Sequence, residues 1–415
     1  MKRFLALILG IVMLAGLPGT AGAAESSPTP TIILDGLPLA FPVPPTIIEG
    51  RTMVPFRAIA EALGVAVLWS DENQSIQAYG PDSMAYLKIG VKTIWVNGIA
   101  KDLDVPPMLV GDRTLVPLRA FSDAFGATVG WDGETFTVSI TSPLRRMRML
   151  AFYAQGSFLN RHLLPDFSDA AFGWSLLNGD GTLNLKQSDS GFWWPDPNGE
   201  ITPELLLQDA RAAGTRRLLV VHQTDRTLQI TNLIRDEALI ARTAASIDAL
   251  VTEKNLDGVI LDLEGLGLSE QGEELAQVRQ GYLRLVTAVA ERMRAAGKET
   301  AVSLPPPNGA YSGYDYAGLA PVVDTIQLMA HDYLIDQPEP DAMVEEAIRM
   351  TVEAVGEANR SKVLLGLRFF ETPETLTRKV GLAKRYNLGG ITFWTLGRLT
   401  PEQKAALDAT VTPRK

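Results

Sequence analysis

The 415-residue chain has no cysteine and only three histidines, His162, His222 and His331, which do not fall into an H-E-x-x-H or similar spacing. Without cysteine, no disulfide can stabilise the chain and no lipid can be attached through an N-terminal cysteine. The same scarcity excludes a metal site rich in histidine or cysteine. An all-oxygen calcium site stays open, because it needs only carboxylates and carbonyls. We expect no cofactor.

The chain also lacks an excess of positive charge. It contains 38 Lys and Arg against 48 Asp and Glu, which gives a net charge of −10. This balance argues against nucleic acid or an anionic membrane surface as the main partner, and it suits a neutral polymer better. No G-x-S-x-G elbow and no phosphate-cradling glycine loop occurs, which argues against an esterase or a nucleotide-binding protein.

Long apolar runs are scarce, and the longest lies at the start of the chain. Met1-Lys2-Arg3 is followed by the apolar run 4–17 and then by Ala21-Gly22-Ala23. This order of charged, apolar and small residues is typical of a secretory signal peptide, so we expect residues 1–24 to be removed near Ala23 or Ala24. A retained anchor is the competing interpretation, but the run is short for a spanning helix. The predicted location is secreted or associated with the cell envelope.

Residues 25–142 contain two copies of one module. The segment Arg51-Thr-Met-Val-Pro-Phe-Arg57 returns 62 residues later as Arg113-Thr-Leu-Val-Pro-Leu-Arg119. The same shift maps Gly36 onto Gly98 and Trp69 onto Trp131. Each copy predicts a short strand and turn, a helix that begins with proline, and a closing hairpin that carries the Trp. We therefore predict a small α+β domain made of two tandem repeats.

This repeat resembles the copper amine oxidase N-terminal-like domain, which occurs beside many catalytic domains of exported bacterial proteins. The resemblance does not bring copper with it, because residues 25–142 contain no histidine or cysteine. It implies an attachment or spacing element, for instance one that attaches the protein to the cell wall. Trp69 and Trp131 are either core residues, which their helix-turn-strand setting favours, or sugar-stacking residues.

From Met147 onward, short apolar strands alternate with amphipathic helices. The predicted strands are 149–153, 171–176, 217–222, 258–263, 300–304, 325–329, 362–367 and 390–394. The predicted helices are 203–213, 232–254, 271–296, 343–359 and 373–386. Eight βα units between residues 146 and 412 predict an α/β fold, a (β/α)₈ TIM barrel, whose active site lies at the carboxyl ends of the strands.

Two carboxylates end the predicted fourth strand, in the run Leu256-Asp-Gly-Val-Ile-Leu-Asp-Leu-Glu264. The strand period of two places Asp262 and Glu264 on one face, with Ile260 deeper in the barrel. Each carboxylate disfavours ionisation of the other, so one can stay protonated near neutral pH and act as a general acid, as cleavage of a glycosidic bond requires. The alternative is that the pair caps the next helix or meets a basic residue.

The barrel segment resembles glycoside hydrolase family 18, the chitinase-like group, and especially its branch that acts on peptidoglycan and the spore cortex. The family motif D-G-x-D-x-D-x-E is matched on the fourth strand by Asp257, Gly258, Asp262 and Glu264. Further matches around the barrel are Phe152-Tyr153, Ser303-Leu-Pro305, Met329-Ala-His-Asp332, Gly366-Leu367 and Trp394.

The resemblance implies substrate-assisted, retaining hydrolysis of β-1,4 bonds next to N-acetylglucosamine, in chitin-type glycans or in peptidoglycan. Glu264 would protonate the leaving oxygen, while Asp262 orients the substrate's own acetamide for attack on the anomeric carbon. The residues that the resemblance assigns to substrate binding are Tyr153, Asp257, Met329, Asp332 and Trp394, the last as the floor under the sugar.

Two residues depart from the family pattern. Ile260 stands where the family has an acid or amide and cannot share a proton with Asp262, which we expect to stay turned toward Glu264. His331 stands where the family usually has a tyrosine that steadies the acetamide, and is expected to act there with a pH-dependent charge. These departures leave an alternative open, a catalytically weak or inactive, lectin-like envelope protein. A purely structural envelope protein is the third reading.

Two other features have simpler expectations. His222, at the end of the third strand, is predicted to be a satisfied structural histidine of the barrel. The loop Phe192-Trp193-Trp194 is either an outer sugar-binding platform or an anchor that holds its loop against the barrel.

Overall fold

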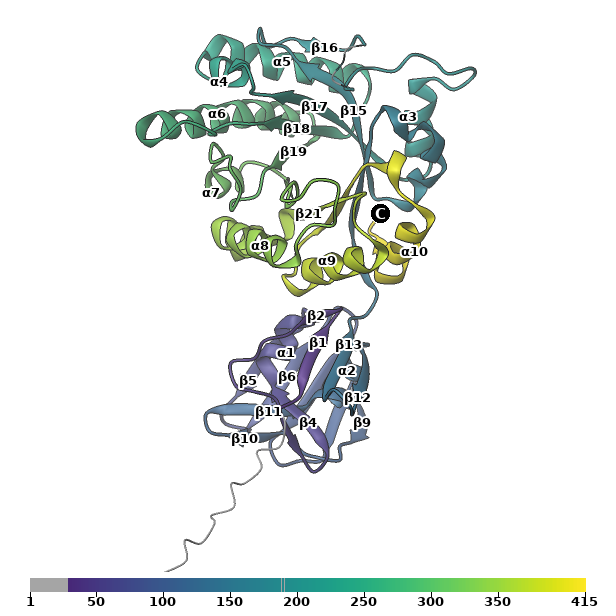
Figure 1. Ribbon diagram of the computed structural model, residues 1–415, viewed down its shortest axis with the longest axis vertical. Coiled ribbons are helices and arrows are strands. Elements are labelled where there is room, and N and C mark those ends of the chain that lie inside the picture. Colours follow the sequence, from purple (N-terminus) through teal and green to yellow (C-terminus); the bar gives the residue numbers. More distant parts are fainter. Residues whose placement is uncertain (1–28, 188, 190) are drawn as a thin grey trace, which may run out of the picture.

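The computed structural model of the protein describes residues 29–187, 189 and 191–415, and Figure 1 shows two domains stacked along its long axis. The predicted signal peptide, residues 1–24, lies outside the described residues. Within the described ranges, no helix is both long and apolar enough to cross a membrane.

The N-terminal domain repeats one set of elements at an offset of 62 residues. The first copy consists of β1 (Thr31–Leu34), β2 (Leu37–Pro38), β3 (Thr46–Ile48), β4 (Arg51–Pro55), α1 (Phe56–Ala62), β5 (Ala66–Ser70) and β6 (Ser75–Tyr79). After β7 (Met84–Lys88), the second consists of β8 (Thr93–Val96), β9 (Ile99–Asp102), β10 (Met108–Val110), β11 (Arg113–Pro117), α2 (Leu118–Ala124), β12 (Thr128–Asp132) and β13 (Thr137–Thr141).

The two copies meet across β4 and β11, where Val54 lies opposite Val116 in an antiparallel pair. These two valines are equivalent in the repeat, so a local two-fold axis passes between them. The copies share one core, to which α1 and α2 contribute the equivalent residues Ile59 and Phe121. Of the two repeat tryptophans, Trp69 packs partly against this core, whereas Trp131 is 44% exposed. The expectation that Trp131 is a core residue is therefore wrong.

The C-terminal domain is a closed barrel of eight parallel strands, as predicted. The strands are β14 (Arg145–Tyr153), β15 (Asp169–Leu177), β17 (Arg216–Thr224), β18 (Gly258–Glu264), β19 (Glu299–Leu304), β20 (Thr325–Leu328), β21 (Val363–Arg368) and β22 (Gly390–Trp394). They pair in chain order, and β14 pairs with both β22 and β15 to close the barrel. The short strands β16 (Leu183–Asn184) and β23 (Val411–Pro413) extend this sheet.

Helices surround the barrel, as Figure 1 shows. They are α3 (Pro203–Ala212), α4 (Gln229–Leu233), α5 (Glu237–Glu253), α6 (Gly272–Ala295), α7 (Tyr316–Leu319), α8 (Asp341–Val355), α9 (Pro373–Arg385) and α10 (Pro401–Thr410), with 3₁₀ segments η1 (Gln155–Asp166), η2 (Glu357–Lys362) and η3 (Leu396–Arg398). The predicted helix 232–254 is divided, because the Asp236 carboxylate accepts the backbone N–H groups of Ala238 and Leu239 and so starts α5 afresh.

Alternate residues of each strand point into the barrel or outward to the helices, as the pleat requires. On β14, Phe152 belongs to the inner cluster, together with Ile260 of β18, whereas Tyr153 belongs to the outer cluster under the helices. A polar layer crosses the interior, where Gln327 bonds to the hydroxyls of Ser303 and Thr392, each at 3.0 Å. Ile260 thus lies within the packed interior, below the carboxylates.

The base of the barrel is closed by ion pairs between strand beginnings. Arg148 lies 2.6 Å from Asp169 and 2.8 Å from Glu299, and Arg216 lies 2.6 Å from Glu299. Thr325 also donates its hydroxyl hydrogen to Glu299, at 2.7 Å. Arg148, Asp169 and Glu299 are largely buried, and the counter-charges lower the pKa of Glu299 against the effect of its burial.

The N-terminal domain lies against α9, at the lower end of the barrel in Figure 1. Lys384 of α9 donates to the Ser142 hydroxyl at 3.1 Å and to the Pro143 carbonyl at 3.0 Å. Arg385 donates to the carbonyls of Leu34 and Pro38. Burial at this contact lowers the pKa of Lys384 to about 8. The two domains are therefore joined by side-chain to backbone bonds as well as by the chain itself.

Candidate active site

Strand β18 delivers two carboxylates to the mouth of the barrel. Asp262 is only 4% exposed, whereas the Glu264 side chain is 40% exposed. In the register of the sheet, His222 of β17 lies beside Asp262. Its Nδ1 is 3.1 Å from Asp262 Oδ2 and 3.9 Å from Glu264 Oε1. Asp262 is therefore held by an imidazole from the neighbouring strand, which also lies near Glu264.

Charge and burial set the protonation of this cluster. Burial and the nearby Asp262 carboxylate raise the pKa of Glu264 to about 7, and His222 acts in the opposite direction. Burial acts to lower the pKa of His222, but its bond to Asp262 and the charges of both carboxylates outweigh this effect and raise it. At neutral pH a large fraction of Glu264 can therefore carry a proton while Asp262 sits beside a basic imidazole.

Backbone hydrogen bonds fix the end of β18. The Tyr314 hydroxyl donates to the Leu263 carbonyl at 2.7 Å and accepts the Leu266 N–H at 3.2 Å. From the other side, the Asp225 N–H donates to the Glu264 carbonyl at 2.8 Å. The backbone that carries Glu264 is thus held on both sides, which limits the positions its side chain can take.

His331 and Asp332 lie after β20, on another side of the mouth. His331 Nδ1 is 3.1 Å from Asp332 Oδ2, and Asp332 is also paired with Arg368 at the end of β21. The bond to His331 and the Arg368 charge lower the pKa of Asp332. Asp332 in turn is one of the charges that raise the pKa of Glu264. Met329 is buried at the end of β20. The structure thus places these three sequence-predicted residues on the mouth side of the barrel.

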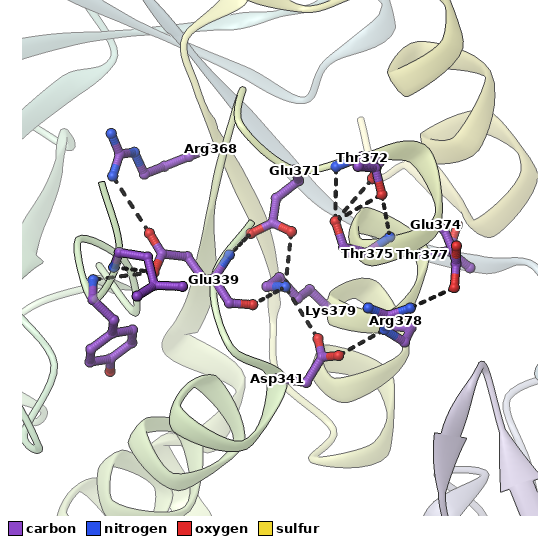
Figure 2. A network of polar contacts seen from close by, with 12 residues as sticks. Glu339, Asp341, Arg368, Glu371, Thr372, Glu374, Thr375, Thr377, Arg378 and Lys379 are labelled. Carbon is purple, nitrogen blue, oxygen red and sulfur yellow. Dashed lines mark hydrogen bonds and ion pairs between the residues drawn. The ribbon is translucent and has the colours of Figure 1, made fainter. Parts of the chain in front are cut away.

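A network of polar contacts continues from Arg368, and Figure 2 shows Glu339, Glu371 and Lys379 within it. Glu339 accepts the backbone N–H of Asp332 at 2.8 Å and lies 3.5 Å from Arg368. Its own N–H bonds to Glu371, which pairs with the fully buried Lys379 at 2.9 Å. The loop that carries Asp332 is therefore fixed by buried charges.

Aromatic rings line the remaining side. Trp394 ends β22, and its ring centroid lies 5.2 Å from that of Phe152. Phe192 stacks on His222 at 3.9 Å and lies 6.2 Å from Trp394. Trp194 packs edge-on against Trp174 at 5.1 Å. Of the two readings of this loop, the packing favours an anchor, with Phe192 placed inside the mouth.

Two residues assigned to the substrate do not reach the mouth. Asp257 precedes β18 at the base, where its carboxylate accepts the Arg217 backbone N–H at 2.8 Å and side-chain hydrogens at 2.9 and 3.1 Å. Tyr153 points outward into a cluster with Phe172 and Trp174. Asp257 is at the base because the motif begins one strand length below the two acids. Tyr153 points outward because side chains alternate along a strand and Phe152 takes the inward position.

The same cluster contains three residues that can act as metal ligands. Ligand atoms of His222, Asp262 and Glu264 lie within 4.8 Å of one another, and within the described part of the chain they are the one such group. A bound cation would hold Glu264 ionised, whereas in the cluster without an ion the pKa of Glu264 is raised to about 7. The same three groups can therefore hold a proton or a cation, and removal of metal ions tells the two apart.

Comparisons with known families and solved structures give matches to the N-terminal repeat and to the barrel. Residues 33–140 match the model of the copper amine oxidase N-terminal domain. The barrel is similar to a chitinase from Chromobacterium violaceum, with TM-score 0.52 and 15% identity, over 63% of this chain and 98% of that one.

Two spore cortex-lytic enzymes, both SleL, are similar as well. The enzyme from Bacillus cereus has TM-score 0.53 and 15% identity, over 66% of this chain and 77% of that one. The enzyme from Bacillus megaterium has TM-score 0.53 and 13% identity, over 75% and 81%. At these identities the similarity establishes the barrel fold.

Sequence reasoning missed His222 and Arg368. The available signal was weak, since each is simply a polar residue at the carboxyl end of a predicted strand. The prediction of a structural histidine leaves out the contact of His222 with Asp262, which nothing in a single sequence reveals.

Proposed function

We propose that the protein is an exported glycosidase that hydrolyses β-1,4 bonds next to N-acetylglucosamine in peptidoglycan or chitin-type glycans. The observation that carries the proposal is the carboxyl group of Glu264, whose pKa is raised to about 7 at the mouth of a TM barrel beside Asp262. An acid with this pKa can give a proton to a leaving oxygen at neutral pH and take one from water afterwards.

In the proposed mechanism the enzyme supplies no carboxylate nucleophile. The substrate's 2-acetamido oxygen attacks the anomeric carbon as Glu264 protonates the departing oxygen, and Asp262 orients the acetamide and stabilises its positive charge. Water then opens the ring intermediate with Glu264 as the base, so that configuration is retained. Trp394 supplies an apolar floor for the sugar, and Asp332 and His331 supply polar contacts from the side.

His222 supports Asp262 in this mechanism. Ile260 offers no hydrogen bond from below, and the imidazole at 3.1 Å provides one from the side instead. Because that imidazole bonds to Asp262 Oδ2, it holds the carboxyl group in place while the positive charge develops on the acetamide. His222 of the neighbouring strand thus provides the hydrogen bond that Ile260, in place of a polar residue, cannot provide.

The test compares the purified protein with its Glu264→Gln variant on chitin oligosaccharides and on peptidoglycan, with products identified by mass spectrometry. Cleavage by the first protein alone supports the proposal. Binding by both proteins without cleavage supports a lectin-like protein, which is the alternative favoured by Ile260 and by Phe192 inside the mouth. If neither protein binds or cleaves either glycan, the result supports a purely structural role in the envelope.

Treatment with a chelator distinguishes the proposed mechanism from metal-dependent hydrolysis. If His222, Asp262 and Glu264 held a catalytic cation, dialysis against EDTA would abolish cleavage and Zn²⁺ would restore it. The proposed mechanism expects the rate to be unchanged by EDTA. Removal of residues 1–24 on export, and attachment to the cell wall through the N-terminal domain, belong to the same proposal and are tested by N-terminal sequencing of the mature protein and by cell fractionation.

A further inference from the structure

Two cavities in the N-terminal domain are related by its internal two-fold axis. Each is formed by the helix and the Trp hairpin of one copy together with the arginine-bearing hairpin of the other. In the first cavity these parts are contributed by Arg119, Trp131 and Arg51, and in the second by the equivalent Arg57, Trp69 and Arg113. The repeat has therefore produced the same cavity twice, and the two differ in their surroundings.

The second cavity faces the barrel. Besides Trp69 and Arg57, its lining includes Arg360, Arg385 and Tyr386 of the barrel domain, so this copy contributes to the contact between the domains. The first cavity has a volume of about 540 Å³, and only residues of the N-terminal domain line it. It is therefore the copy that is free to meet a partner outside the molecule.

Two differences between the copies expose Trp131. In the first copy, the indole N–H of Trp69 donates to Asp71 at 2.6 Å, and the ring packs against Phe56 with centroids 6.4 Å apart. The positions equivalent to Asp71 and Phe56 are Gly133 and Leu118. Within the described chain, the Trp131 indole N–H has no hydrogen-bond partner, and the residue is 44% exposed. The second copy has thus lost these two groups, and its tryptophan is instead contacted at one edge by Phe136, with ring centroids 5.7 Å apart.

The polar lining of this cavity is nearly balanced in charge. Arg51 pairs with Asp104 at 2.6 Å along one wall. Arg119 and Asp123 are both exposed and form no ion pair with the described residues, so a free donor and a free acceptor lie on the helix side. A cavity with an exposed indole and mixed donors and acceptors suits a neutral ligand with one apolar face and many hydroxyl groups.

We propose that the cavity around Trp131 is a second carbohydrate-binding site, which holds a glycan strand by stacking a pyranose ring on the indole. Hydroxyl groups of the sugar bond to Arg119, Asp123 and the Trp131 indole N–H. The choice of glycan rests on the proposed function of the barrel, since a polymer cut at one domain can be retained by the other. Binding at two linked sites raises retention on a polymer far above that of either site alone.

Retention on insoluble chitin, which contains glycan and no peptide, tests this site. The full-length chain is compared with Trp131→Ala and Gly133→Asp, the second of which places a carboxylate where the first copy has Asp71. We expect each variant to bind chitin at least tenfold more weakly than the parent chain. Gly133→Ala is the matched control for Gly133→Asp, because a Cβ at Gly133 would lie 3.4 Å from the indole nitrogen and bring no acceptor. It should bind like the parent.

Three further readouts separate this site from the barrel. Trp69→Ala should leave chitin retention within twofold, and Trp131→Ala should leave cleavage of short soluble oligosaccharides unchanged. Retention that Trp131→Ala does not reduce, or that only Trp394→Ala removes, overturns the proposal. Trp131-dependent retention on peptidoglycan that is lost when the stem peptides are removed also overturns it and points to a peptide ligand. Because retention is read without hydrolysis, an inactive barrel would not hide the result.

Discussion

At the base of the barrel, Asp169 and Glu299 share the two guanidinium groups of Arg148 and Arg216, whereas at the mouth Asp262 and Glu264 share one imidazole. Burial acts to raise the pKa of both glutamates; the counter-charges at the base outweigh it and lower the pKa of Glu299, whereas burial and the nearby acids at the mouth raise the pKa of Glu264 to about 7. One barrel thus holds the same residue type in two protonation states, and the ratio of acids to bases around each glutamate decides which.

This contrast shows where the fold is stabilised and where it is left reactive. Asp262 Oδ1 is buried without a hydrogen-bond partner among the described residues, whereas both Asp169 oxygens bond to Arg148. An unsatisfied buried acceptor costs stability, and such groups persist where a ligand completes them. Substitutions at the two ends should therefore separate activity from stability.

The largest effect is expected from comparing one substitution at the mouth of the barrel with one at its base. Glu264→Gln should lower kcat by about a hundredfold to ten-thousandfold, because it removes the general acid, and should leave the melting temperature unchanged. Asp169→Asn should leave kcat at low temperature within twofold and lower the free energy of unfolding by about 1 to 3 kcal/mol, since Arg148 loses one of its two buried partners and keeps Glu299. Calorimetry and initial rates on a chitin oligosaccharide measure both. A stability loss in Glu264→Gln equal to that of Asp169→Asn would remove the distinction between the ends.

Asp262→Asn should show how much the charge of Asp262 raises the pKa of Glu264. The general acid must be protonated, so the rate of the parent enzyme should fall as pH rises through about 7, the pKa of Glu264. Removing the Asp262 charge lowers that pKa, so the alkaline limb should move to lower pH, and kcat should fall about a hundredfold as the acetamide loses its support. A pH-rate profile records both changes. An alkaline limb that stays in place would show that Asp262 does not govern Glu264.

His222→Leu should move the same limb in the opposite direction. The positive charge of His222 lowers the pKa of Glu264, so its loss should raise the alkaline limit, and kcat should fall about tenfold because Asp262 loses its donor.

Stability gives an independent check on His222. The pKa of His222 is raised in the folded protein, so its contribution to stability is fully present below the ordinary histidine pKa of about 6.5 and is lost as pH rises through the raised value. Urea unfolding of the parent and the variant should therefore differ most at pH 5 and least at pH 9. An equal difference at both pH values contradicts the ion pair with Asp262.

The smallest effect is expected from Tyr153→Phe, which tests the outward position of this residue. Its buried hydroxyl has no hydrogen-bond partner among the described residues, and burial raises its pKa to about 12. Replacing it with a ring of the same shape should leave KM unchanged and keep stability within about 1 kcal/mol of the parent. A several-fold rise in KM would place Tyr153 in the substrate site after all.

Much of the fold follows from periodicities that are local in sequence. The repeat of 62 residues, the eight apolar strands and the helices that begin at Thr-Pro pairs could all be read from the chain. So could the placement of Asp262 and Glu264 at the end of β18, with Ile260 below them, because a strand fixes the direction of every second side chain. The predictions for Asp257 and Tyr153 are wrong, because Asp257 lies at the beginning of its strand and Tyr153 takes the outward position on β14.

The sequence by itself determined that two repeats precede a barrel and that one strand carries two acids to its mouth, because those features depend on neighbours along the chain. Only the tertiary structure decided that His222 lies beside Asp262, that Phe192 enters the mouth and that Arg51 of one repeat faces Trp131 of the other. Each of these pairs joins segments brought together by strand register, loop packing or the two-fold axis. Such contacts are set by closure of the whole sheet, which no local pattern encodes.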